Sequence, residues 1–240
     1  MSTRRQAYSI RALRSDRTFS ADNEGILVAV NCLFRAGATG NLYAPVYEVA
    51  LADGTQQPLP LQVNLEDVTA ARFSPDGRRV GQAIRFGGSA CASEFSLFVT
   101  DADGANSQEL TLPAVADARL REHAEVRGGL VGYDWSPDSD AVVASFNVSL
   151  CVSLQTEPFV EVEPVLAGLY ILTLDGFAAE LLLDGATYSP AWSPSGRSIA
   201  YVTGESFGET EPPKLHVLDL SSDEVIDIGL GAQPAWRPRP

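Results

Sequence analysis

Short apolar runs bounded by turn residues recur along this chain and predict an all-β protein. In WSPSGRSIAYVT, an aromatic residue (Trp192) precedes a Ser-Pro turn, and an apolar run of strand length follows it. Similar segments begin at Phe19, Phe73 and Trp135, and a truncated copy, PAWRPRP, ends the chain around Trp236. These aromatic residues are 44 to 62 residues apart and include all three tryptophans. Internal repetition on this scale is typical of repeat architectures.

A second aromatic position marks a later strand in each repeat. It is occupied in turn by Tyr47, Phe98, Tyr170 and His216. Asp-Gly follows this strand in three of the four repeats, and Ser-Ser-Asp takes its place in the fourth. Asp-Gly between apolar runs predicts a β-hairpin, because glycine accepts the positive φ of a tight turn. DADGAN, at 101–106, is therefore interpreted as a hairpin turn and not as a calcium loop, which needs a terminal Glu at the correct spacing.

Each repeat is thus predicted to hold four antiparallel strands, A to D, and such units are the blades of propellers. The predicted fold class is an all-β β-propeller of four-stranded antiparallel blades, with four full repeats plus a fifth inner strand. A β-sandwich is the alternative, but it has no reason to repeat a Trp-Ser-Pro turn every four strands. The expected organisation is a basic arm over 1–18, able to add one edge strand, and a propeller over 19–240, with repeats near 19–67, 68–129, 130–186 and 187–231 and a terminal strand over 232–237.

The segment PAWSPSGRSIAYVTG…KLHVLDLSSDEV resembles the repeat unit of TolB-type, WD-repeat-like β-propellers. The resemblance covers about residues 19–237, and it is specific for the fold but weak for function, because such propellers serve many roles. The chain departs from the Pro-Ala-Trp-Ser-Pro-Asp-Gly pattern at Ala21, Asn23, Ser139 and Ser195. The resemblance implies six or more blades. Two alternatives therefore stay open: the terminal strand adds to the first blade, or the chain is part of a larger propeller.

Charge and hydropathy limit the classes of partner. The net charge of −14 argues against nucleic acid, because its phosphates would be repelled. No apolar run reaches the roughly 18 residues of a transmembrane segment, and the N-terminus lacks the apolar stretch of a signal peptide. The default expectation is a cytoplasmic protein, with the periplasm or cell envelope as the alternative if a leader has been removed.

The three cysteines, Cys32, Cys91 and Cys151, fit no zinc-site spacing. All three fall near the end of strand B in successive repeats. Because neighbouring blades diverge outward, their Cα atoms are not expected to come within the about 7 Å that a disulfide needs. The sequence therefore predicts three free thiols.

The variable loop lengths indicate which face binds a partner. The B–C and D–A connections share one face and vary in length, whereas the A–B and C–D turns on the other face stay short, and long loops on a rigid scaffold commonly carry binding sites. The second D–A segment, 113–129, is expected to form a short helix at the rim. The third and fourth B–C loops, 149–164 and 204–213, hold the candidate partner-binding residues, which are Glu157, Phe159, Glu161, Glu163, Glu205, Phe207, Glu209 and Glu211. They predict an acidic rim with two aromatic anchors for a basic protein or peptide. The alternative is that the glutamates only maintain solubility and the Phe side chains pack under their own loops.

The sequence does not support an enzyme. GESFG, at 204–208, matches the Gly-x-Ser-x-Gly of a hydrolase, but that motif requires a following helix and Glu-Thr-Glu-Pro-Pro comes next. His216 occupies a packing position, and His123 is interpreted as a solvated surface side chain. No catalytic, cofactor-binding or metal-binding residue is assigned, and no cofactor is expected. The predicted function is a non-catalytic scaffold that binds a protein or peptide on its loop-rich face. The alternative is the substrate-gating propeller of a prolyl-oligopeptidase-like hydrolase whose catalytic domain is not in this chain.

Overall fold

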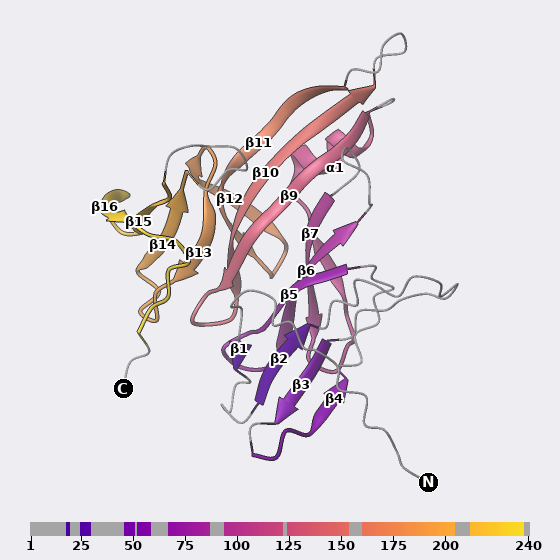
Figure 1. The fold of residues 1–240 in the computed structure, drawn as a ribbon, viewed down its shortest axis with the longest axis vertical. Coiled ribbons are helices and arrows are strands. Elements are labelled where there is room, and N and C mark those ends of the chain that lie inside the picture. The colour runs from indigo at the N-terminus through magenta and orange to yellow at the C-terminus, as the bar shows by residue number, and fades with distance from the viewer. Residues whose placement is uncertain are drawn as a thin grey trace.

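Sixteen strands and one helix form the regular structure of the described residues (Figure 1). The computed structural model describes residues 18–19, 25–29, 46–50, 52–58, 67–86, 94–121, 124–153, 160–204 and 212–237. The strands follow one another in four units of four antiparallel strands, in agreement with the four repeats of the sequence. The first unit contains β1 (Thr18–Phe19), β2 (Gly25–Ala29), β3 (Val46–Ala50) and β4 (Gln56–Pro58).

The other units repeat this hairpin-connected order. The second contains β5 (Asp67–Phe73), β6 (Arg79–Phe86), β7 (Glu94–Asp101) and β8 (Gln108–Leu110), followed by α1 (Pro113–Arg119). The third contains β9 (Ala124–Trp135), β10 (Ala141–Ser153), β11 (Val160–Thr173) and β12 (Ala178–Asp184). The fourth contains β13 (Tyr188–Trp192), β14 (Ser198–Thr203), β15 (Lys214–Asp219) and β16 (Glu224–Leu230).

The turn after the repeated aromatic owes its geometry to the serine. In the second unit the Ser74 N–H donates to the Arg79 carbonyl (2.9 Å), while the Ser74 hydroxyl accepts from the Arg79 N–H (3.0 Å). Ser136 and Ser193 make the same pair of bonds to the residue five positions later, and all three serines are buried. One side chain thus supplies the hydrogen bonds that close each turn, which explains why the sequence repeats serine here.

The first strands of successive units lie next to each other through the repeated tryptophan. The Trp135 indole N–H donates to the carbonyl of Arg72 (3.1 Å), and the Trp236 indole N–H donates to that of Ala191 (2.9 Å). In both cases the acceptor residue directly precedes the aromatic of the preceding repeat. Trp135 is 4% exposed. The repeat predicts the same burial for Trp192, but Trp192 is only partly buried. Residues 231–237 make this indole contact but form no strand, so the fifth inner strand expected over 232–237 is not formed here.

The strands of the third unit extend far beyond the repeat pattern. Its first strand begins at Ala124, before position 130 where the sequence places the third repeat. β9 pairs in parallel with β7 through Phe95 and Gly129, and this joins the second and third units into one eight-stranded sheet. The expected long loop over 149–164 is mostly strand, because β10 continues to Ser153 and β11 begins at Val160. In Figure 1 these long strands rise to the upper end of the molecule.

Most of the described core lies between units, and one smaller cluster, with Val80 and Ile84, lies within the second unit. The largest buried cluster joins β6 to β11 with α1 and includes Leu97, Trp135 and Leu150. A second cluster joins the third and fourth units through Leu169 and Ile199. Each sheet alone has two faces to cover, so packing one unit on the next is what buries them.

Candidate functional site

The structure tests little of the predicted acidic rim directly. Six of the eight candidate residues lie outside the described residues, namely Glu157, Phe159, Glu205, Phe207, Glu209 and Glu211. Glu161 and Glu163 lie on β11 and not in a loop, because Leu150 and Val152 on β10 pair opposite them. Only Glu163 has a described side chain, and Arg121 forms an ion pair with it at 2.8 Å. Glu161 and Glu163 therefore belong to an extended hairpin, whose alternating Val-Glu-Val-Glu pattern is a strand signal.

The predicted rim helix is present, and Arg119 anchors it. The Arg119 guanidinium donates to the Glu94 carboxylate, to Glu109 (2.6 Å) and to the Ser96 hydroxyl (3.1 Å), all on the second unit. Val115 and Ala118 are buried beneath the helix. Burial opposes ionisation of the Glu109 carboxyl, but hydrogen bonds led by that from Arg119 outweigh it and lower the pKa of Glu109 below its ordinary value of 4.5.

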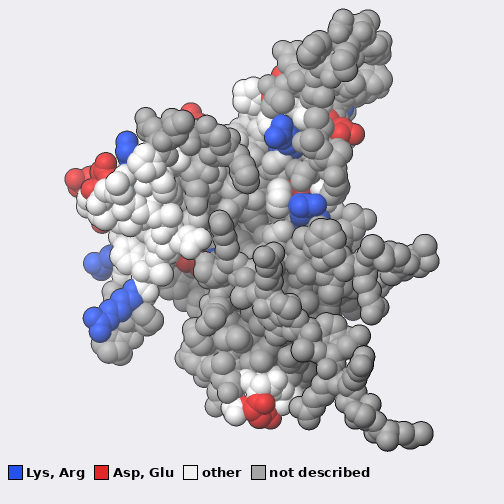
Figure 2. All heavy atoms as spheres, in the orientation of Figure 1, with Lys and Arg blue, Asp and Glu red and all other residues white. Residues whose placement is uncertain are grey.

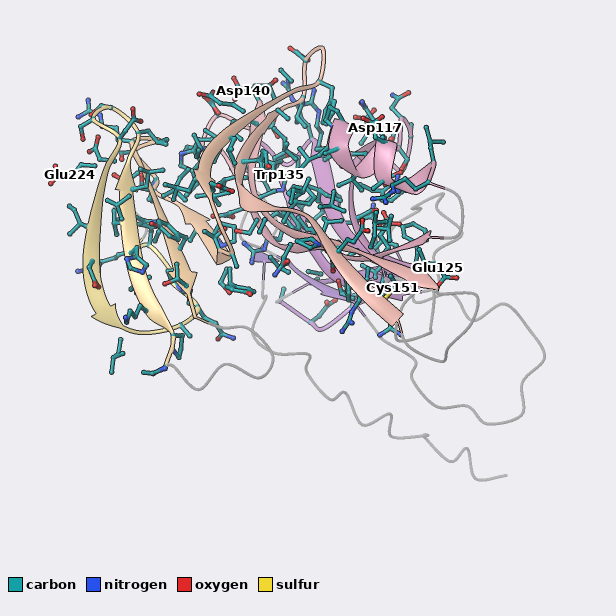
Figure 3. The ribbon with its side chains drawn as sticks, turned by 90° about the horizontal axis from the view of Figure 1, so that it is seen from above. Asp117, Glu125, Trp135, Asp140, Cys151 and Glu224 are labelled. Carbon is teal, nitrogen blue, oxygen red and sulfur yellow. The ribbon has the colours of Figure 1, made fainter. Side chains whose placement is uncertain are left out.

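The prediction of three free thiols is wrong, because Cys151 is disulfide-bonded. Its partner is one of the other two cysteines, Cys32 and Cys91, and both lie outside the described residues. Cys151 is buried near the end of β10, opposite Glu125 on β9 (Figure 3). The prediction assumed that neighbouring units diverge outward. The β7–β9 pairing instead keeps the second and third units together at this end.

A partly buried charge pair joins two inner strands, and the sequence reasoning missed it. Arg72 on β5 forms an ion pair with Asp134 on β9 at 3.1 Å, and the second Asp134 oxygen accepts the backbone N–H of Trp192 on β13 at 2.8 Å. Asp134, in the third unit, therefore contacts both the second and the fourth unit. Burial raises the pKa of Asp134, although the Arg72 charge and backbone N–H donors act in the opposite direction. The signal was available: Arg72 and Asp134 directly precede the repeated aromatic in consecutive repeats, where their opposite charges predict contact.

The candidate histidine has a packing role, as expected. The His216 ring stacks on Tyr201 with centroids 5.2 Å apart, and its Nε2 lies 2.9 Å from the Thr203 hydroxyl. Ser206 of GESFG and His123 lie outside the described residues. The DADGAN segment forms a hairpin turn, in which the Gly104 N–H donates to the Asp101 carbonyl at 2.8 Å. Within the described part of the chain no group of three or more His, Cys, Asp or Glu side chains is arranged to hold a metal ion.

None of the helices in the described ranges has the length and apolar character of a membrane span. Figure 2 shows acidic and basic side chains of the described surface in separate small groups.

Comparisons with known proteins give the fold and not the family. No protein-family model and no curated protein sequence matches the chain. Its structure is similar to that of TolB from Acinetobacter baumannii, with a TM-score of 0.57 and 15% identity over 89% of this chain and 43% of that one. It is also similar to the oligogalacturonate lyase of Vibrio parahaemolyticus (TM-score 0.54, 12% identity, 89% and 53% covered) and to the tricorn protease (0.53, 10%, 89% and 22%).

These structural similarities show a β-propeller fold. Within that class, the fold is of the TolB type. The resemblance of the sequence repeats to TolB-type propellers is thus confirmed at the level of the fold. The chain spans less than half the length of this TolB and about half that of the lyase.

Proposed function

We propose that this protein is a non-catalytic β-propeller scaffold that binds a basic protein or peptide on its loop-rich face. The observation that carries the proposal is the extended β10–β11 hairpin. It extends from the sheet that joins the second and third units and bears Glu161 and Glu163, which follow Glu157 and Phe159 in the sequence. A hairpin held by paired strands loses less conformational entropy on binding than a free loop, which favours its use as a recognition element.

The fourth unit packs beside the third. Val143 on β10 lies in one buried cluster with Ile199 on β14, and these two strands lead to the third and fourth B–C connections. The connections that leave these strands carry Phe159 and Phe207 with four glutamates, and Glu161 and Glu163 follow on β11. Aromatic side chains are frequent hot spots of interfaces, and a field of one sign steers an oppositely charged partner.

The test begins with capture of a partner from the lysate and envelope fractions of the native host. The double variant Phe159→Ala with Phe207→Ala should weaken binding of that partner without lowering the melting temperature, and wild-type binding should weaken as salt rises. Arg78→Ala and Arg197→Ala, on exposed short turns, are the matched controls and should leave binding unchanged. Arg79 is unsuitable, because it donates to the Ser139 carbonyl. Loss of binding in the controls alone would reverse the assignment of the face.

The likeness to the tricorn protease favours one second candidate, a propeller that gates access to a hydrolase. A reading frame that continues past Pro240 and encodes the nucleophile elbow of a hydrolase would support this candidate. Peptide hydrolysis by the longer protein, with none by residues 1–240 alone, would establish it.

We further infer that the protein works in an oxidising compartment. The Cys151 disulfide supports this, because disulfides persist mainly in oxidising environments such as the bacterial periplasm and cell exterior. This inference replaces the cytoplasmic default expected from the sequence with its alternative, the periplasm or cell envelope.

A further inference from the structure

The outer edge of the fourth unit presents an apolar strand with acidic flanks. β16 is the terminal strand of its sheet, and β15 is the strand with which it pairs in the described part of the chain. An edge strand directs alternate N–H and C=O groups away from its neighbour, where they can pair with another chain. Natural edge strands are commonly protected by lysines, prolines or short length. The seven residues of β16, EVIDIGL, include no lysine or proline. Their only charges are the acids Glu224 and Asp227, and the pairing with β15 is regular from Glu224 to Asp227 and shifts only after it.

Apolar side chains are exposed on both faces of this edge. Val225 lies opposite Leu218 and is 42% exposed, and Ile226 lies opposite Val217 and is 48% exposed. Leu218 belongs to the buried cluster between the third and fourth units, so Val225 extends that packed face outward. Because residues 225 and 226 point to opposite faces, a ligand that covers both must continue the sheet. A peptide laid on one face would leave the other exposed.

The charges of β16 determine what kind of strand fits. Glu224 and Asp227 are exposed and enclose the two apolar residues, giving the order acid, apolar, apolar, acid. Asp227 is held in place by the backbone N–H of Gly229, which donates to its carboxylate at 2.8 Å. Figure 3 shows Glu224 at the outermost strand, away from the rest of the molecule. The basic side chain of Lys214 lies at the other end, opposite Leu230.

We propose that β16 is a docking edge for an extended peptide segment of the order basic, apolar, apolar, basic. Side chains directly opposite in adjacent strands interact, and opposite charges there are stabilising. The complementary order reads the same in both directions, so it matches β16 as a parallel or an antiparallel strand. The added strand pairs its backbone with the free edge and places its cations beside Glu224 and Asp227. The occupant is a peptide or a protein segment with this pattern, in keeping with the net charge of −14.

A second copy of this chain is disfavoured by the same charges. A two-fold antiparallel pairing that places Val225 opposite Ile226 also places Glu224 opposite Asp227, and it does so twice. Like charges directly opposite each other destabilise strand pairing.

The test measures binding of a short end-capped peptide with a Lys-Val-Val-Lys core by fluorescence polarisation. Wild-type protein should bind it more weakly as salt rises, and Glu224→Lys with Asp227→Lys should lower the affinity at least about tenfold. The same variant should gain affinity for a Glu-Val-Val-Glu peptide that wild type does not bind. Glu180→Lys, on the exposed edge strand β12, is the matched control and should behave as wild type. Equal binding of both peptides by wild type and variant would overturn the proposal.

Two further measurements separate the alternatives. Two versions of the peptide are N-methylated, one at its odd-numbered amides and one at its even-numbered amides. Only one version should lose binding, because an added strand donates every second amide to the edge. If both versions bind equally, strand addition is excluded. If the protein alone forms a dimer that Ile226→Lys dissociates, the edge binds a second copy and the proposal fails. This surface is independent of the loop-rich face, so Phe159→Ala with Phe207→Ala should leave peptide binding unchanged.

Discussion

At the scale of single residues, the repeated tryptophan links one unit to the next. Trp135 is buried, and its indole N–H donates to the Arg72 carbonyl, whereas Trp192 is only partly buried and bonds within its own turn, to the Gly196 carbonyl at 3.3 Å. Trp135→Ala should lower the free energy of unfolding by about 3–5 kcal/mol. Trp192→Ala should cost at least about 1 kcal/mol less, because it removes less buried area. Urea unfolding of both variants measures this difference, and an equal or larger loss for Trp192→Ala would contradict the account.

Glu109 gives a pH dependence with a defined sign. Its pKa is lowered in the folded protein, so its contribution to stability is present above its ordinary value of 4.5 and is lost as pH falls through the lower folded value. Glu109→Gln should therefore lower the free energy of unfolding by about 1 kcal/mol near pH 6, and wild type and variant should converge towards about pH 3. The comparison is made by urea unfolding across this range. A difference that stays constant with pH would show that the Arg119–Glu109 pair contributes through packing alone.

Sequence reasoning at this scale succeeded where a residue recurs. The repeated aromatic and serine positions were recognisable because the same packing and the same turn recur in each unit. Asp134 was missed because only one repeat places an acid there, and its partner Arg72 lies one unit earlier in the chain. Such a pair is detected when the charges at equivalent positions of adjacent repeats are compared, in addition to the search for identical residues.

At the scale of elements, the joint between β7 and β9 depends on Gly129, which pairs with Phe95. Gly129 has φ +121°, and a Cβ there would lie 2.1 Å from the Phe95 carbonyl oxygen. Gly129→Ala should thus combine backbone strain with a clash against the paired strand. Gly176 also has positive φ, at +75°, but a Cβ there would meet nothing within 4 Å. Gly129→Ala should destabilise the protein by at least about 1 kcal/mol more than Gly176→Ala. Equal effects in thermal or urea unfolding would show that the strand joint tolerates a side chain.

The pattern of apolar runs and turns predicts which strands form but not how long they are. The predicted second, third and fourth strands of each repeat are all present, because apolar runs and turn residues mark them locally. The sequence predicts a loop for the extension of β10 and β11, because the third repeat has the longest interval between its two aromatic positions. What makes it a strand is its pairing with β9, and β9 in turn pairs with β7 of another unit. Pairing between units is not encoded in any local window of sequence.

At the scale of the whole molecule, the disulfide fixes the number of reactive thiols. The chain has three cysteines and Cys151 is disulfide-bonded, so the oxidised protein should show one free thiol. Titration with a thiol reagent under denaturing, non-reducing conditions measures it. After reduction the count should rise to three, and the melting temperature should fall because the unfolded chain is less constrained. Three thiols before reduction would remove both the disulfide and the inference of an oxidising compartment.

The central claim is that the loop-rich face of this propeller binds the partner, and a hydrogen-exchange footprint tests it most directly. Backbone amides are compared in the free protein and in the complex with the captured partner. The account predicts slower exchange within 154–159 and 205–211, the segments that follow β10 and β14, and unchanged exchange at the short turns 74–78 and 193–197. Protection of these short turns, with the two longer segments unchanged, would contradict it.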